Sequence, residues 1–108
     1  MIEQPKYSKG QQKIFVDIDE TICFYPQKRI YELAVPLKEN IEKINSLYDE
    51  GAHITYYSAR GTTSKINYYD LTKSQLDMWG CKYHQLITGE KLAWDLIIDD
   101  KSIRIEEL

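Results

Sequence analysis

KIFVDIDET, residues 13–21, decides the fold, because it joins a short apolar run to two aspartates. Four or five successive β-branched and aromatic residues are typical of a strand that is buried on both faces of a sheet. The pattern therefore predicts a strand over 13–18, with Asp17 near its carboxyl end. Asp19, Glu20 and Thr21 then form the turn that follows this strand.

Strand and helix patterns alternate along the rest of the chain. Pro36 is expected in the first turn of a helix, and Gly51 is expected to end that helix. Thr72 and Gln75 are spaced as a capping box, which would divide a second helical region into two short helices. The expected strands are 13–18, 53–57, 83–87, 96–98 and 103–105, and the expected helical regions are 36–50 and 64–79.

This alternation predicts an α/β fold with a Rossmann-like parallel sheet flanked by helices. Connections between parallel strands are right-handed, and a sheet built from them is expected to carry helices on both faces. A length of 108 residues fits a single domain over 1–108. In open sheets of this kind, ligands bind at the carboxyl ends of the strands.

The composition argues against several classes of protein. A hydrophobic fraction of 43% with nine tyrosines is that of a packed globular domain. The net charge of −3, from 14 basic and 17 acidic residues, argues against binding to nucleic acid through a basic surface. No apolar run approaches the ~20 residues of a membrane helix, and the polar start does not have the pattern of a signal peptide. A cytoplasmic location without a membrane partner is therefore expected.

Polar residues follow the predicted strands at what should be one edge of the sheet. Carboxylates gathered there would repel one another unless a cation neutralised them, and oxygen ligands beside a substrate phosphate suit Mg²⁺. Hydroxyl groups and turn amides can bind phosphate oxygens. Together with a lysine, these groups suffice for phosphoryl transfer through an aspartyl-phosphate. They are Asp17, Asp19 and Thr21 after the first strand, Ser58 after the second, Lys91, and Asp99 and Asp100 after the strand at 96–98.

Each of these features has a simpler explanation when it is taken alone. A single DxDxT is more often turn chemistry or a helix cap, and a pair of aspartates often just ends a strand. These separate explanations become less convincing when the features are taken together, because the polar clusters directly follow strands at the same edge of the sheet. A receiver domain also gathers acids, a hydroxyl residue and a lysine, but its middle strand ends in the phosphorylated Asp. Here the middle strand ends in Ser58, which argues against a receiver domain.

The same residues resemble the motifs of the haloacid dehalogenase (HAD) superfamily. Residues 14–21 are similar to its first motif, 53–58 to its second and 96–100 to its fourth. The resemblance implies a Mg²⁺-dependent phosphatase with a HAD core. It implies that Asp17 is the nucleophile and a metal ligand. Asp19 would be the general acid and base, and its backbone carbonyl would also reach the metal.

The resemblance also assigns the remaining residues of the site. Ser58, Lys91 and Thr21 would hold the phosphoryl group, and Asp99 or Asp100 would complete the Mg²⁺ shell. A closer similarity, over 58–63, 72–79 and 95–101, is to small HAD proteins of bacterial capsule and surface-polysaccharide gene clusters. It implies a phosphosugar or a related small metabolite as substrate. The third motif of such proteins often reads GKP, whereas 89–92 reads GEKL, so Lys82 is the alternative to Lys91.

The spaces between the motifs are too short for a cap domain. A capless core with an open site is expected, which suits a bulky substrate or a cap supplied by a neighbouring subunit of a homo-oligomer. Lys28, Arg29 and Tyr25 would form a small flap. Arg60 is a candidate contact to a second anionic group, with a surface role or a carboxylate partner as the alternative.

Two other functions are compatible with the same motifs. One is a nucleotide or polynucleotide end phosphatase, for which the chain shows no basic strand-binding pattern. The other is a non-catalytic HAD-like binding domain. A non-catalytic member would be expected to lose one of the acids of the motifs, whereas this chain has all four: Asp17, Asp19, Asp99 and Asp100.

Overall fold

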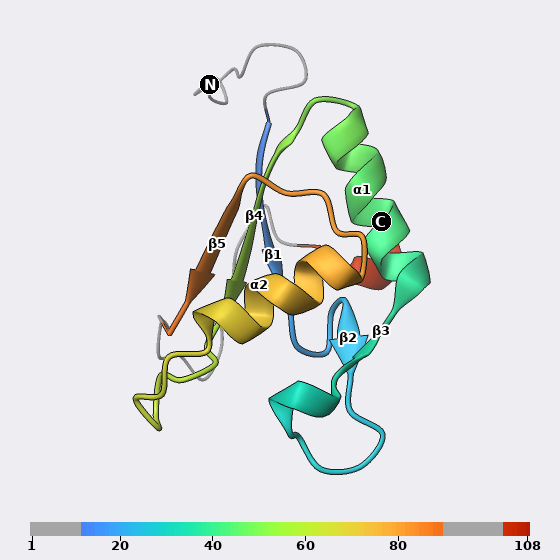
Figure 1. The fold of residues 1–108 in the computed structure, drawn as a ribbon. Helices are drawn as coiled ribbons and strands as arrows, with labels where there is room; N and C mark the ends of the chain where they lie inside the picture. Colours follow the sequence, from blue (N-terminus) through green and yellow to red (C-terminus); the bar gives the residue numbers. More distant parts are fainter. Residues whose placement is uncertain (1–11, 90–102) are drawn as a thin grey trace.

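A parallel three-stranded sheet forms the centre of the protein (Figure 1). The computed structural model describes residues 12–89 and 103–108. The strands lie in the order β1-β4-β5, and their bounds are β1 (Lys13–Asp17), β4 (His53–Ser58) and β5 (Gln85–Thr88). The predicted α/β fold is therefore confirmed, and each of these strands lies within two residues of its predicted position.

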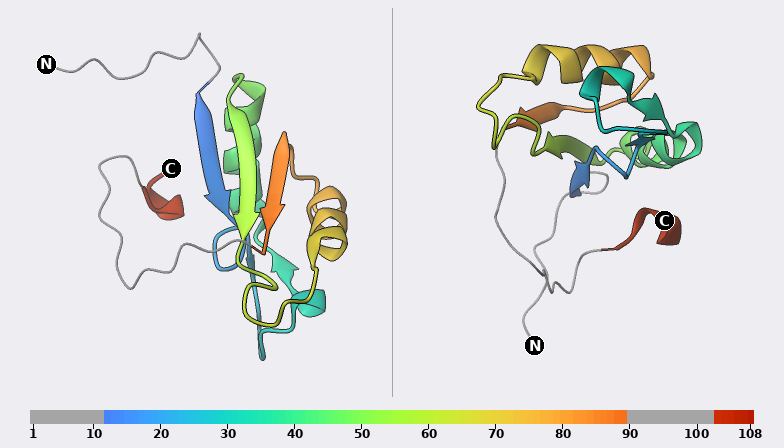
Figure 2. Two further views of the ribbon diagram at one scale, coloured as in Figure 1. Left: turned by 90° about the vertical axis from the view of Figure 1, so that its left-hand side faces the viewer. Right: turned by 90° about the horizontal axis from the view of Figure 1, so that it is seen from below.

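Both α-helices lie on the same face of this sheet (Figure 2). The helix α1 (Lys38–Asp49) precedes β4, and α2 (Tyr69–Met78) connects β4 to β5. The strand order advances in one direction, so two crossovers of the same hand must place both helices on one side. Helices on both faces were expected. Among the described residues the opposite face carries neither helix, and Phe15 on β1 is 61% exposed, so β1 is not buried on both faces.

The core lies between β4 and the two helices. Ile54 and Tyr56 on β4 are fully buried, because this strand has a neighbour on each side and helices over one face. Ile41 and Ile44 of α1 and Leu76 of α2 belong to the same apolar cluster. Ile41 and Ile44 are three positions apart, so they lie on one face of α1, and this face packs toward the sheet.

A short two-stranded sheet follows β1 in the chain. It pairs β2 (Cys23–Phe24) with β3 (Val35–Pro36) in antiparallel order, and the loop between them contains the 3₁₀ helix η1 (Tyr31–Leu33). Figure 1 shows this part of the chain beyond the carboxyl ends of the main strands. We call residues 23–36 the β2–β3 segment.

The start of the first helix was predicted two residues too early. Pro36 pairs with Cys23 in the small sheet, and the amide of Leu37 donates to the carbonyl oxygen of Ile22 at 2.8 Å. These contacts keep the chain extended, so the helix begins at Lys38. Its end was predicted correctly: Gly51 has a φ of 104°, the left-handed conformation in which glycine ends helices.

Three other expectations about elements fail or lie outside the described residues. Thr72 and Gln75 do not form a capping box, because both side chains lie in the interior of α2 and bind other elements. The strand expected at 103–105 is replaced by the 3₁₀ helix η2 (Ile105–Glu107). The strand expected at 96–98 lies outside the described residues. Within 12–89 and 103–108, no helix is long and apolar enough to cross a membrane.

We predict that Gly61→Ala destabilises the protein more than Gly80→Ala. Both glycines have positive φ, 87° and 76°. A Cβ at Gly61 would overlap the carbonyl oxygen of Ile66, whereas a Cβ at Gly80 would have open space. The left-handed backbone alone costs about 1 kcal/mol at either position, and the overlap should raise the loss at Gly61 to about 2 kcal/mol or more. Urea denaturation measures both values, and equal losses would contradict the prediction.

Candidate active site

The carboxyl ends of β1 and β4 bring the predicted site residues together. Asp17 is the last residue of β1 and pairs in register with Tyr57 of β4. Ser58, the last residue of β4, is buried, and its hydroxyl donates to Oδ2 of Asp19 at 3.4 Å. The parallel arrangement therefore places these groups at one edge of the sheet, as the sequence had predicted.

The turn after β1 is held by two buried isoleucines. Ile18 and Ile22 are both 0% exposed, and the carbonyl of Ile18 accepts the amides of Thr21 and Ile22. Glu20 adopts a left-handed conformation with a φ of 66°, which completes the tight turn. Because the isoleucines face the core, the aspartates on either side of Ile18 face the edge of the sheet.

Asp17 is the exposed acid of the site. Its Oδ1 accepts the amide of Ile18 at 2.8 Å, and within 12–89 and 103–108 it forms no ion pair. Partial burial of its carboxyl group raises the pKa above the usual value, and the nearby charge of Asp19 acts in the same direction. The hydrogen bond from Ile18 and the charge of Arg29 oppose this rise without cancelling it.

Asp19 is held very differently by Arg60. The Nη2 of Arg60 lies 2.9 Å from Oδ1 of Asp19, and its Nε lies 3.2 Å from Oδ2. The hydroxyl of Tyr25 donates to Oδ1 at 2.5 Å. Burial would raise the pKa of Asp19, but the hydrogen bonds from Arg60 and Tyr25 and the charge of Arg60 outweigh it, so the pKa is lowered. Asp19 is therefore held as a carboxylate.

Arg60 lies inside the molecule and uses its whole guanidinium group there. It is 1% exposed, and its Nη1 donates to Oε1 of Gln75 at 2.5 Å and to Oγ1 of Thr72 at 3.1 Å. Its Nη2 also donates to the hydroxyl of Tyr25 at 3.0 Å. The suggested contact with a second anionic group of the substrate does not fit this position. The structure instead shows the alternative role, in which Arg60 pairs with a carboxylate, that of Asp19.

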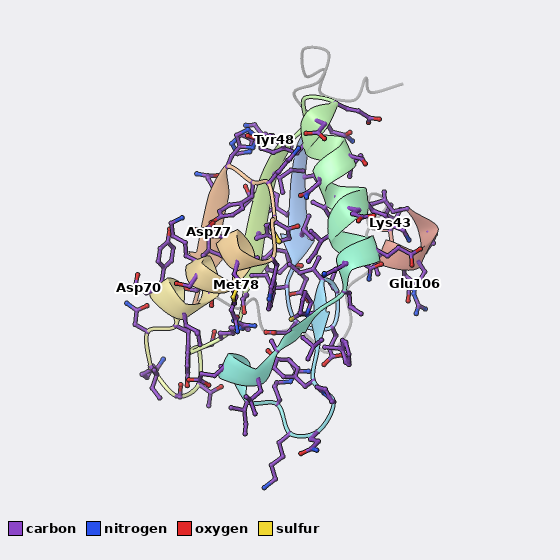
Figure 3. All side chains as sticks on the ribbon, turned by 45° about the vertical axis from the view of Figure 1, so that its right-hand side comes forward. Lys43, Tyr48, Asp70, Asp77, Met78 and Glu106 are labelled. Carbon is purple, nitrogen blue, oxygen red and sulfur yellow. The ribbon has the colours of Figure 1, made fainter. Side chains whose placement is uncertain are left out.

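The buried face of α2 carries the residues that hold Arg60. Thr72 and Gln75 are buried, whereas Asp70, Asp77 and Met78 lie on exposed parts of the same helix (Figure 3). A buried guanidinium needs acceptors for its N–H groups, and polar residues three positions apart on one helix face can supply them together.

The β2–β3 segment is fastened to α2 rather than suspended as a free flap. The Nε2 of Gln75 donates to the carbonyl of Tyr31 at 2.6 Å, and the Tyr31 ring lies 4.8 Å from the ring of Tyr68. The guanidinium of Arg60 lies 4.9 Å from the centre of the Tyr31 ring. This segment therefore forms a wall of the site.

Thr21 is placed beside the acids by contacts of its backbone. Its carbonyl accepts Nδ2 of Asn40 at 2.9 Å. A hollow of about 750 Å³ is lined in part by Thr21, Asp17 and Tyr57. This hollow provides space next to the exposed carboxylate.

Of the four remaining candidate residues, the structure describes Lys82 alone. Lys91, Asp99 and Asp100 lie outside the described residues. Lys82 cannot replace Lys91, because it precedes β5 and pairs with Asp49 at 2.8 Å, at the amino ends of the strands. The structure thus contradicts the alternative assignment of the lysine of the third motif.

Two carboxyl groups of the described residues lie at the carboxyl end of β1. No cluster of three or more His, Cys, Asp or Glu side chains is found within 12–89 and 103–108. Asp17 and Asp19 nevertheless give two acids at one strand end, and the ionised form of Asp17 is disfavoured there. Hard oxygen donors whose negative charge is not compensated suit Mg²⁺. Of the two described acids, Asp17 meets this condition, because Arg60 compensates the charge of Asp19. The carboxylate of Asp17 is therefore a donor that fits Mg²⁺.

Sequence reasoning missed Tyr31, Thr72 and Gln75 as parts of the site. Thr72 and Gln75 were singled out by their spacing, but this spacing was assigned to a helix cap. No local pattern marks a pair of polar residues inside a helix as the partner of an arginine from another element.

Comparison with known proteins supports the fold. No family model and no curated protein matches the chain. A crystal structure of a structural-genomics target from Vibrio cholerae is similar, with a TM-score of 0.78 and 21% sequence identity. The similarity covers 90% of this chain and 86% of that chain. At this identity it concerns the fold alone, so any function must be argued from the site.

We predict that Arg60→Met destabilises the protein strongly. The substitution leaves Asp19 and Gln75 without their cationic partner inside the structure, and breaking such a pair costs about 3–5 kcal/mol. Lys82→Ala is the matched control, since the pair of Lys82 with Asp49 is half-exposed and worth less than about 1 kcal/mol. Chemical denaturation should separate the two variants clearly, and a small loss for Arg60→Met would show that the network is dispensable.

A second prediction concerns pH. Because the pKa of Asp19 is lowered in the folded state, its contribution to stability is present above the unfolded value of about 4 and is lost as the pH falls through the folded pKa. The difference in unfolding free energy between wild type and Asp19→Asn should therefore shrink as the pH is lowered from about 6 to about 3. Urea titrations at each pH measure it, and a constant difference would refute the assignment.

Proposed function

We propose that this protein is a Mg²⁺-dependent phosphomonoester hydrolase of the HAD type, with Asp17 as the nucleophile. One observation carries the proposal. Two aspartates leave the same strand end in different states: Asp19 is held by Arg60 and Tyr25, while Asp17 stays exposed and forms no ion pair within the described residues. Asp17 is therefore the carboxyl group of this pair that a substrate can reach.

Asp17 would act by attacking phosphorus. A bond forms between its carboxylate oxygen and phosphorus, and the bond from phosphorus to the leaving oxygen breaks. Water then attacks phosphorus, inorganic phosphate leaves, and the carboxylate is regenerated. The turn at Thr21 borders the same hollow as Asp17 and would contact the phosphoryl oxygens. Ser58 would join it, as the resemblance implies, by exchanging the bond of its buried hydroxyl to Asp19 for one to a phosphoryl oxygen. Lys91 would neutralise the transferred group, as the resemblance implies.

Asp19 would transfer the protons in both steps. In the structure its pKa is lowered, so it is ionised and carries no proton for the leaving oxygen. A phosphoryl dianion that enters beside it would raise its pKa, because a like charge disfavours the ionised form. Proton donation by Asp19 is therefore proposed to depend on the bound substrate.

A divalent cation fits the donors of this edge. The carboxylate of Asp17 and the backbone carbonyl of Asp19 would hold it, together with Asp99 or Asp100. When bound, Mg²⁺ would neutralise charge on the phosphoryl oxygens and lower the repulsion between them and the carboxylates.

We further propose a phosphosugar or a related small metabolite as the substrate. The resemblance to capsule and surface-polysaccharide proteins supports this class. The β2–β3 segment forms only the small sheet and a short helix, so it supplies a wall and no cap domain. A cytoplasmic location, and a neighbouring subunit that covers the site, remain predictions.

Asp17→Asn should abolish Mg²⁺-dependent phosphatase activity while leaving the fold intact. The neutral amide is not a nucleophile, and activity should fall by at least about 10³-fold, as expected for loss of a covalent step. The pKa of Asp17 is raised, so its charge does not stabilise the fold. The melting temperature of the variant without metal should therefore be no lower than that of wild type.

The measurement is a screen of phosphosugars and nucleotides with and without Mg²⁺, combined with thermal unfolding. Mg²⁺ should raise the melting temperature of wild type and have a smaller effect on Asp17→Asn. Stabilisation by Mg²⁺ without turnover of any substrate would favour the non-catalytic binding domain. Equal turnover by wild type and Asp17→Asn would overturn the assignment of the nucleophile.

A further inference from the structure

We propose that Arg29 binds the phosphoryl group of the substrate, exchanging its ion pair with Glu20 for the phosphate oxygens. The proposal rests on the proposed function, because it assumes a phosphate at Asp17. It gives the β2–β3 segment a direct part in substrate binding.

The position of Arg29 is set by two residues of the site. Its Nη2 lies 3.0 Å from Oε1 of Glu20, the residue that follows Asp19. Its guanidinium carbon lies 5.2 Å from the centre of the Tyr25 ring, and the hydroxyl of that ring donates to Asp19. Stacking on a ring that is itself anchored restricts where the guanidinium can go. Arg29 is thus held at the entrance to the acidic site.

The exchange from Glu20 to phosphate is energetically easy. The side chains of Arg29 and Glu20 are 49% and 57% exposed, and such solvated pairs contribute little. A guanidinium binds phosphate through two parallel hydrogen bonds, which are stronger and more directional than a single contact with a solvated carboxylate.

The other cations within the described residues that have an assigned partner are occupied elsewhere. Arg60 is buried against Asp19 and α2. Lys73 pairs with Asp77 on the exposed side of α2, and Lys82 pairs with Asp49 at the opposite end of the sheet. Arg104 pairs with Glu106 at the start of η2. Among the ion pairs of residues 12–89 and 103–108, the pair of Arg29 with Glu20 is the one whose carboxylate follows Asp19 in the turn after β1.

The experiment compares Arg29→Ala, Arg29→Lys and Lys28→Ala in the full chain. The readouts are KM for the best phosphomonoester found and the inhibition constant of inorganic phosphate. Arg29→Ala should raise both values by about tenfold, the effect of losing one charge-assisted contact. Arg29→Lys should recover part of the loss, because it keeps the charge but not the paired hydrogen bonds. Lys28→Ala, which removes an exposed neighbouring charge, should leave both values within about twofold.

Glu20→Gln provides a second test of the exchange. Removing its charge frees Arg29, so the inhibition constant of phosphate should fall by about twofold to fivefold, the amount that an exposed pair is worth. In the Arg29→Ala background the same substitution should have a clearly smaller effect, since no pair is left to break. Equal effects in both backgrounds would show general repulsion between Glu20 and phosphate, and would contradict the exchange.

The outcomes separate this proposal from the proposed function. If wild type turns over phosphomonoesters but Arg29→Ala binds phosphate as well as wild type does, the role of Arg29 is wrong and the function stands. A rise in KM without a rise in the phosphate inhibition constant would also overturn it, since Arg29 would then contact another part of the substrate. If wild type shows no turnover, the proposed function itself fails. Thermal unfolding of Arg29→Ala should match wild type, which excludes misfolding as the cause.

Discussion

The ion pair between Asp19 and Arg60 is the interaction on which the rest of the site depends. Arg60 is 1% exposed, and a charge at that depth requires a carboxylate and further acceptors around it. These come from different parts of the chain: Asp19 from the turn after β1, Tyr25 from the β2–β3 segment, and Gln75 from α2. Because the buried guanidinium binds acceptors from three parts of the chain, it holds these parts together around the carboxyl end of β4.

The same pair divides the two aspartates into two chemical states. Arg60 compensates the charge of Asp19 and lowers its pKa, whereas no comparable contact exists for Asp17 within the described residues. Asp17 also feels the charge of Asp19, which disfavours its ionised form. An exposed carboxylate beside a fixed one attracts a cation and can reach a substrate. This arrangement links the network to the proposed chemistry.

Much of the fold could be predicted from short-range patterns, and the failures share one physical cause. Apolar runs marked three strands, and Gly51 marked the end of α1, because strand burial and a left-handed helix end are local requirements. The start of α1 was misplaced because Pro36 is held by a pairing with Cys23, thirteen positions away. Thr72 and Gln75 were misassigned for the same reason: their partner, Arg60, comes from another element.

The sequence by itself determined that two aspartates and a serine would end neighbouring parallel strands, because strand ends follow from local apolar patterns and parallel strands share an edge. Only the tertiary structure decided what each charged group does there. Arg60 became an internal partner of Asp19, and Arg29 remained exposed beside Glu20. The burial of a charge and the identity of its partner depend on contacts between distant segments, and these arise only when the elements pack together.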